Sequence, residues 1–159
     1  MKRTLDPIAR LMQEHDHALL QLKKLSRAVQ AFSSDGYSPK YYREILAALK
    51  FIDVEVRVHN RSEEEALFPV IERYVEGPTN NLRDDHKKLQ REFTRLARAV
   101  KNVRQHRDSF SRIKKLSKVS QSVVHIFVNH IHKENHILFP LVQRFLTREE
   151  LREIAKRML

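Results

Sequence analysis

Apolar side chains recur every three or four residues along most of the chain, which is the period of a helix that buries one face. The stripe is clearest where Ile45, Leu49, Ile52 and Val56 follow one another at steps of four and three residues. The same period predicts four long helices, over about 7–32, 39–74, 80–106 and 110–145. A Thr-Arg-Glu-Glu sequence at 147–150 matches a capping box and predicts a short last helix over about 148–158.

Turn-forming residues are scarce, since the 159 residues include two Gly and five Pro. This scarcity favours a few long helices over many short elements, and the length suits one domain with a single core. We therefore expect an all-α fold in one domain over residues 1–159. The expected architecture is an antiparallel up-down four-helix bundle made of two tandem helical hairpins, with a short C-terminal helix.

The apolar stripe of the second helix continues into polar residues. His59 and Glu63 follow Val56 at steps of three and four, so they share its face and point into the core. In the fourth helix His130 and Glu134 continue an apolar stripe in the same way. A buried carboxylate without a partner is costly, and a metal ion held by both side chains would offset that cost.

These two His-Glu pairs belong to a tandem repeat of roughly seventy residues. Each pair is followed by Leu-Phe-Pro, which begins eight residues after the histidine. Each is also preceded, 44 residues upstream, by a histidine that follows an acidic residue: His15 in the first copy and His86 in the second. The repeat predicts two helical hairpins, over about 8–76 and 79–146, with ligand-type residues at equivalent positions.

This pattern resembles the hemerythrin-like, HHE cation-binding family, whose members hold a non-haem di-iron centre inside a four-helix bundle. The resemblance covers about residues 8–145. It implies a set of six metal ligands: His15, His59, Glu63, His86, His130 and Glu134.

The sequence departs from oxygen-carrying hemerythrins at two places. A further third-helix histidine of those proteins is replaced here by Leu82, and their fourth-helix aspartate, five residues after its histidine, is replaced by Asn135. The resulting set is closer to hemerythrin-like proteins linked to iron handling, nitric oxide or peroxide responses, and iron–sulfur repair. Leu82 is expected to widen an opening at the metal centre.

The resemblance implies two iron ions with carboxylate and oxo bridges, and Mn or Zn could substitute because imidazole and carboxylate ligands suit all three metals. We expect one ion near His15, His59 and Glu63, and the other near the second set of ligands, with the two glutamates bridging. The expected function is to bind, sense or react with oxygen, nitric oxide or peroxide, or to handle iron. Turnover of peroxide or oxygen at open iron sites is a further alternative, although no site for an organic substrate is evident.

The other histidines and acids near the six ligand residues are explained without a role in metal binding. His17 competes with His15 for the same role, and buried histidines could pair with acids without any metal. Glu64 and Glu65 are expected to face away from the site as surface acids. Three histidines lie off the ligand stripe, His125, His132 and His136, and His106 is expected in solvent near a helix end.

Composition limits the compartment and the chemistry. The chain contains no Cys, which excludes disulfides and thiolate metal sites. It shows neither an apolar run long enough for a transmembrane helix nor one of signal-peptide length. We therefore expect a cytoplasmic protein with no membrane partner.

Positive charge is concentrated in one segment. The chain carries a net charge of +11, and residues 87–118 hold twelve Lys or Arg against two acids. A solvated helix face would explain this charge. The alternative is a regulatory or interaction module that uses the basic face to bind an anionic partner, such as nucleic acid or an acidic protein. No base-reading motif accompanies the segment, and Phe93 and Phe110 are expected to be core or boundary residues.

Overall fold

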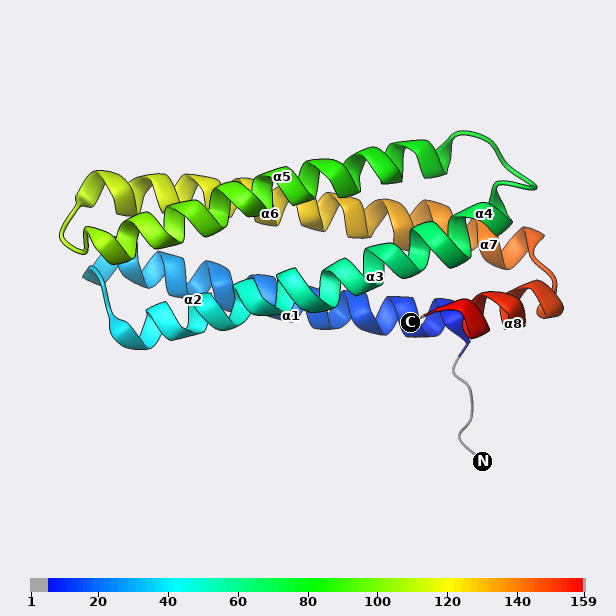
Figure 1. Cartoon of the computed structure of the whole chain (residues 1–159), viewed down its shortest axis with the longest axis horizontal. Helices are drawn as coiled ribbons and strands as arrows, with labels where there is room; N and C mark the ends of the chain where they lie inside the picture. Colours follow the sequence, from blue (N-terminus) through cyan, green and yellow to red (C-terminus); the bar gives the residue numbers. More distant parts are fainter. Residues whose placement is uncertain (1–5, 159) are drawn as a thin grey trace, which may run out of the picture.

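The computed structural model describes residues 6–158, which form helices and no β-strand (Figure 1). The first long helix is α1 (Pro7–Asp35). The second is continuous but contains two wider π-helical segments, η1 and η2: α2 (Pro39–Phe51), η1 (Ile52–Val56), α3 (Arg57–Ser62), η2 (Glu63–Leu67) and α4 (Phe68–Ile71). The third is α5 (Pro78–Gln105). The fourth again contains a π-helical segment: α6 (Phe110–Lys133), η3 (Glu134–Leu138) and α7 (Phe139–Phe145).

The four long helices pack as two antiparallel hairpins, as the sequence predicted. Helix α1 lies against α2 and α6, and α5 lies against α6 (Figure 1). The short helix α8 (Arg148–Arg157) folds back beside the start of α1. Its predicted capping box is present, since the side chains of Thr147 and Glu150 each accept a hydrogen bond from the other's backbone N–H. No helix in the described part of the chain is long and apolar enough to cross a membrane.

The π-helical turns η2 and η3 occupy equivalent places in the two halves, directly before Phe-Pro. A proline has no N–H and its ring crowds the carbonyl four residues earlier, so an ordinary α-turn cannot continue through it without strain. A wider turn just before the proline relieves this conflict. The second helix therefore passes through Pro69 and ends at Ile71, and the fourth passes through Pro140 to Phe145.

Buried apolar residues form three clusters along the bundle. One fills the end that carries the α1–α2 and α5–α6 turns, around Phe32 and Leu116. A second fills the opposite end, where Phe68 and Phe139 pack with Ile154 of α8. The third lies between them. The polar site described below interrupts the core between the second and third clusters, so it is enclosed by apolar residues on both sides along the axis.

One sequence expectation about packing is wrong. Phe110 begins α6 at the tip of the α5–α6 hairpin, and 75% of its surface is exposed. Its neighbours Ser109 and Ser111 are polar, and the core of α6 begins only at Ile113. Phe93, by contrast, is partly buried against two core clusters, as expected.

Candidate metal centre

Six buried polar side chains converge inside the bundle, and they come from all four long helices. The histidines lie on α1, α3, α5 and α6, and each glutamate is the first residue of a π-helical turn. Each histidine is at most 7% exposed, and both glutamates are fully buried. The set is the one that the sequence singled out: His15, His59, Glu63, His86, His130 and Glu134.

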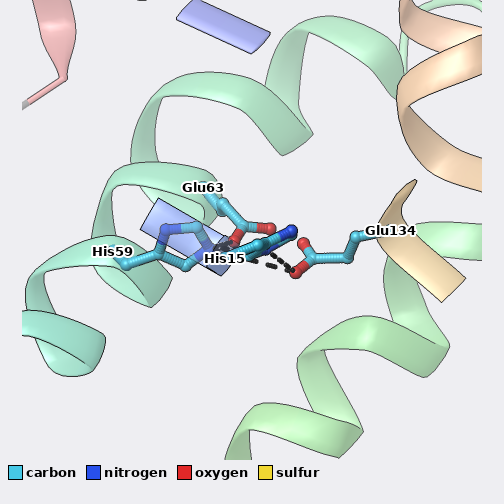
Figure 2. Close-up of side chains that lie close together, drawn as sticks. All are labelled: His15, His59, Glu63 and Glu134. Atoms are coloured by element: carbon cyan, nitrogen blue, oxygen red, sulfur yellow. Dashed lines mark hydrogen bonds and ion pairs between the residues drawn. The ribbon is translucent and has the colours of Figure 1, made fainter. Parts of the chain in front are cut away.

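Their ligand atoms form two clusters that share one residue. His15, His59, Glu63 and Glu134 make the first, and His86, His130 and Glu134 make the second, with the atoms of each within 4.8 Å of one another. The Nε2 atoms of His15 and His59 are 3.1 Å apart, and Glu134 Oε1 lies 3.1 Å from His15 Nε2 (Figure 2). His17, the competitor for His15, is exposed and belongs to neither cluster.

The second cluster is built in the same way. His86 Nε2 and His130 Nε2 are 3.1 Å apart, and His130 Nε2 lies 3.0 Å from the same Oε1 of Glu134. A carboxylate that faces both pairs of imidazoles is well placed to bridge two cations.

The carboxylates are under-satisfied without a cation. Glu63 Oε2 and Glu134 Oε2 have no hydrogen-bond partner, and the other oxygen of Glu63 lies against His59 Nε2. Fully buried carboxylate oxygens without partners cost several kcal/mol each, of the order found for unpaired buried ions. Imidazole nitrogens and carboxylate oxygens without sulfur are suited to Fe, Mn or Zn. The donor set therefore fits a metal centre.

The outer nitrogen of each histidine is held by a second residue. His59 Nδ1 is 2.9 Å from Glu14 Oε1, and His130 Nδ1 is 3.1 Å from Asp85 Oδ2. Each Nδ1–H donates to its carboxylate, which fixes the tautomer and leaves Nε2 free to face the centre. Glu14 and Asp85 directly precede His15 and His86 in sequence. Each acid accepts a hydrogen bond from the other histidine of its own half, His59 or His130.

His15 on α1 and His86 on α5, the first-helix histidines of the two hairpins, each have their Nδ1 held by a residue of the opposite half. His86 Nδ1 is 2.9 Å from Glu64 Oε1, and His15 Nδ1 is 2.7 Å from Asn135 Oδ1. The expectation that Glu64 faces away is wrong, because its carboxylate, although partly exposed, reaches His86 on α5. Glu65 is exposed and pairs with Arg61, as expected of a surface acid.

Aromatic rings complete the enclosure. Phe68 stacks on His86 with ring centroids 5.9 Å apart, and Phe139 stacks on His15 at 5.5 Å. These are the phenylalanines of the two Leu-Phe-Pro segments, so each segment covers a histidine of the other half. Sequence reasoning recognised the segments as repeat markers and missed this contact.

Equivalent histidines in the two halves have opposite pKa shifts. Burial by itself would lower the pKa of His59, but the carboxylates of Glu63 and Glu14 outweigh burial and raise it to about 9. At His130 burial dominates and lowers the pKa to about 4. Burial also lowers the pKa of His15, aided by the neighbouring His59. In the metal-free protein the carboxylates of Glu63 and Glu14 therefore favour the charged form of the His59 imidazole.

One flank of the site opens into a cavity of about 240 Å³. It lies between α1, the second long helix and α6, and it reaches His15, His59, His130 and Glu134, with Ala18 in its wall. In the second half the residue equivalent to Ala18 is Leu89. The hollow that Leu89 lines measures about 30 Å³ and touches only His86 among the six residues.

The opening expected at Leu82 is not where the site opens. Leu82 is 2% exposed and packs in the core cluster near Phe68 and Phe139. The hollow beside Leu82 is lined by none of the six residues.

Comparison with known proteins agrees with this geometry. The family model described as "Hemerythrin HHE cation binding domain" matches residues 6–142. An iron-sulfur cluster repair protein, YtfE, from Yersinia pseudotuberculosis is 26% identical over 141 residues, which cover 86% of this chain and 63% of that protein. F-box/LRR-repeat protein 5 from Mus musculus is 22% identical over 118 residues, which cover 74% of this chain and 17% of that protein. The chain thus spans less than two thirds of the length of these relatives.

Proposed function

Because the chain belongs to the hemerythrin HHE cation-binding family, we propose that it is a non-haem di-iron protein whose buried centre binds or reacts with a small diatomic molecule or oxidant, or handles iron. The observation that carries this proposal is the pair of fully buried glutamates, each with one oxygen that has no partner, among the imidazoles of four buried histidines. Iron is favoured over Mn or Zn because one relative is named for the repair of iron–sulfur clusters.

Each of the six residues has a defined place in this proposal. His15, His59 and Glu63 would hold one ion, His86 and His130 the other, and Glu134 would bridge them, as the shared position of its Oε1 suggests. When bound, the two ions supply redox chemistry and open positions for a small ligand. The protein's own contribution is to fix the Nε2 atoms inward, through hydrogen bonds at every Nδ1, and to surround the centre with apolar residues that limit water.

The cavity beside Ala18 supports a small molecule as the ligand. Its walls include Phe51, Val56, Phe127 and Ile131, and it reaches the imidazoles and the Glu134 carboxylate of the centre. Oxygen, nitric oxide and peroxide are all small enough to reach the centre by this route. Reversible binding and turnover remain alternatives within the same proposal.

Metal analysis of aerobically purified protein, with a near-ultraviolet and visible spectrum, tests the proposal. We expect about two irons per chain and oxo-bridge or ligand-to-iron charge-transfer bands. His59→Ala combined with His130→Ala should abolish both. The matched control is His132→Ala with His136→Ala, because these two exposed histidines stack on each other away from the centre. Metal-free wild-type protein that stays folded after iron supplementation would overturn the proposal.

A second candidate function rests on the basic segment 87–118. Among the ion pairs found in residues 6–158, its twelve Lys and Arg contribute one, between Arg95 and Glu92. Arg95, Arg98 and Lys115 line a hollow of about 70 Å³ between α5 and α6, with Asn102 beside them. Several cations around one hollow repel one another, and an anion would offset that repulsion. We therefore infer that this face could bind an anionic partner, either nucleic acid or an acidic protein.

Charge reversal distinguishes a defined face from general attraction to a basic protein. Arg91→Glu, Arg98→Glu and Lys115→Glu together should weaken binding of a labelled single-stranded oligonucleotide at least tenfold and reduce its salt dependence. The control reverses three exposed cations of α1, Lys23, Lys24 and Arg27, and changes the net charge equally. Equal weakening by both triple variants would show that net charge alone is responsible. Tighter binding of polyglutamate than of the oligonucleotide would favour an acidic protein.

A further inference from the structure

The two halves of the chain build the centre with one chemical difference. Residues related by an offset of 71 occupy equivalent places, so His15 corresponds to His86 and Glu64 to Asn135. Each residue of the second pair crosses to the opposite half and accepts the Nδ1–H of a first-helix histidine. The histidine of the second half therefore has a carboxylate behind it, and the histidine of the first half has a neutral amide.

This difference singles out one histidine of four. His59, His86 and His130 each donate to a carboxylate, from Glu14, Glu64 and Asp85. Only His15, within the four, donates to an uncharged oxygen, at 2.7 Å from Asn135 Oδ1. The stacked phenylalanine on each first-helix histidine is the same in both halves, so the acceptor is what differs.

The nature of the acceptor changes what the imidazole offers to a cation. A hydrogen bond from Nδ1–H to a carboxylate is charge-assisted, and it makes the opposite nitrogen a stronger donor. An amide oxygen polarises the ring less. A stronger donor favours the more highly charged oxidation state of a bound metal, because that state gains more from added electron density.

We propose that Asn135 and Glu64 are positioning residues that make the two metal positions inequivalent. Asn135 keeps the ion beside His15 more weakly held and easier to reduce than a carboxylate at that place would, whereas Glu64 has the opposite effect on the ion beside His86. Glu63 adds a carboxylate to the first cluster alone. Because Glu63 also makes the two clusters unequal, the effect of residues 64 and 135 on the metal must be measured by changing them while the six inner residues are kept. This inference rests on the proposed metal centre.

Two nearly isosteric substitutions test it. Asn135→Asp should tighten one of two divalent-cation sites about tenfold, and Glu64→Gln should weaken the other about tenfold, since outer-sphere partners of metal-bound histidines typically change affinity 10–100-fold. The measurement is competition of the metal-free protein with a chromophoric chelator for Co²⁺ or Zn²⁺, which does not depend on iron chemistry. In iron-loaded protein the same variants should move one reduction wave each, downward for Asn135→Asp and upward for Glu64→Gln. A tenfold change in the preference for ferric over ferrous iron equals about 59 mV in a one-electron couple.

Matched controls carry the same charge changes off the site. Glu65→Gln removes the next carboxylate, which is exposed and pairs with Arg61, and Asn129→Asp adds one on the outer face of α6. Neither should change affinity or potential. Two bound ions whose affinities stay unchanged in Asn135→Asp and Glu64→Gln would overturn this inference alone. A wild-type protein that binds no divalent cation would overturn the proposed metal centre along with it.

Discussion

The two flanks of the buried centre carry equivalent inner residues but differ in the hollows beside them. Their backbones differ as well, because η1 (Ile52–Val56) in the second helix has no counterpart in α6 (Phe110–Lys133). Both halves place a histidine on the first helix of the hairpin, a His-Glu pair on the second, and a π-helical turn before Phe-Pro. Yet the cavity past Ala18 measures about 240 Å³, and the hollow lined by the equivalent Leu89 measures about 30 Å³. On the second flank a surface hollow of about 460 Å³ also reaches His86. A tandem repeat thus specifies where ligand residues lie, while residues that differ between the halves, such as Ala18 and Leu89, set the shape of the hollow on each flank.

The largest effect is expected from removing the shared carboxylate. Glu134 belongs to both clusters and Glu63 to one, so Glu134→Ala should lower bound iron to well below one ion per chain, while Glu63→Ala should retain one. Metal analysis of the two variants, loaded side by side, measures the difference. If both variants keep the same amount of iron, the two glutamates contribute equally to metal binding, and the two flanks are equivalent at the metal.

The next effect concerns the cavity. Ala18→Leu makes the first flank resemble the second, and it should slow association of azide or nitric oxide with the iron-loaded protein at least tenfold, or about 1.4 kcal/mol of barrier. Leu89→Ala should leave that rate unchanged on the first flank, while lowering stability by about 3 kcal/mol because it removes a buried side chain. Stopped-flow absorbance and urea unfolding provide the two readouts. An unchanged rate in Ala18→Leu would exclude this cavity as the route.

The smallest effect concerns pH and the metal-free protein. His130 has a pKa of about 4 when folded, against 6.5 for an ordinary histidine, so the unfolded chain binds more protons in between and stability falls as pH drops below 6.5. His59 has a pKa of about 9, so its contribution is fully present below pH 6.5 and is lost as pH rises through 9. We expect the free energy of unfolding, measured with urea from about pH 4 to about pH 9.5 so that the range covers both pKa values, to be highest near neutral pH.

Single substitutions separate the two limbs of that profile. His59→Phe should flatten the alkaline limb and leave the acid limb, because it removes only the group whose pKa is raised. His130→Phe should do the reverse. An acid limb that persists unchanged in His130→Phe would show that other groups, such as Asp85 with its lowered pKa, set the acid stability.

Most of the fold followed from local pattern. The period of the apolar residues predicted all four long helices, and their ends differ from the prediction by a few residues, as at Asp35 and Ile71. The six inner residues could be singled out because they continue apolar stripes and recur in two halves. Residues 14 and 85 were noticed only as markers of the repeat, because which histidine they contact depends on how helices pack.

The sequence by itself determined the helices, the repeat and the inward direction of six polar side chains, because all of these depend on spacing within a single helix. Only the tertiary structure decided that Glu64 reaches His86, that Asn135 reaches His15, and that a cavity forms beside Ala18. The π-helical turns rotate the residues that follow them away from regular helical positions. Contacts between halves and the volume left by a small side chain arise only when four helices pack together.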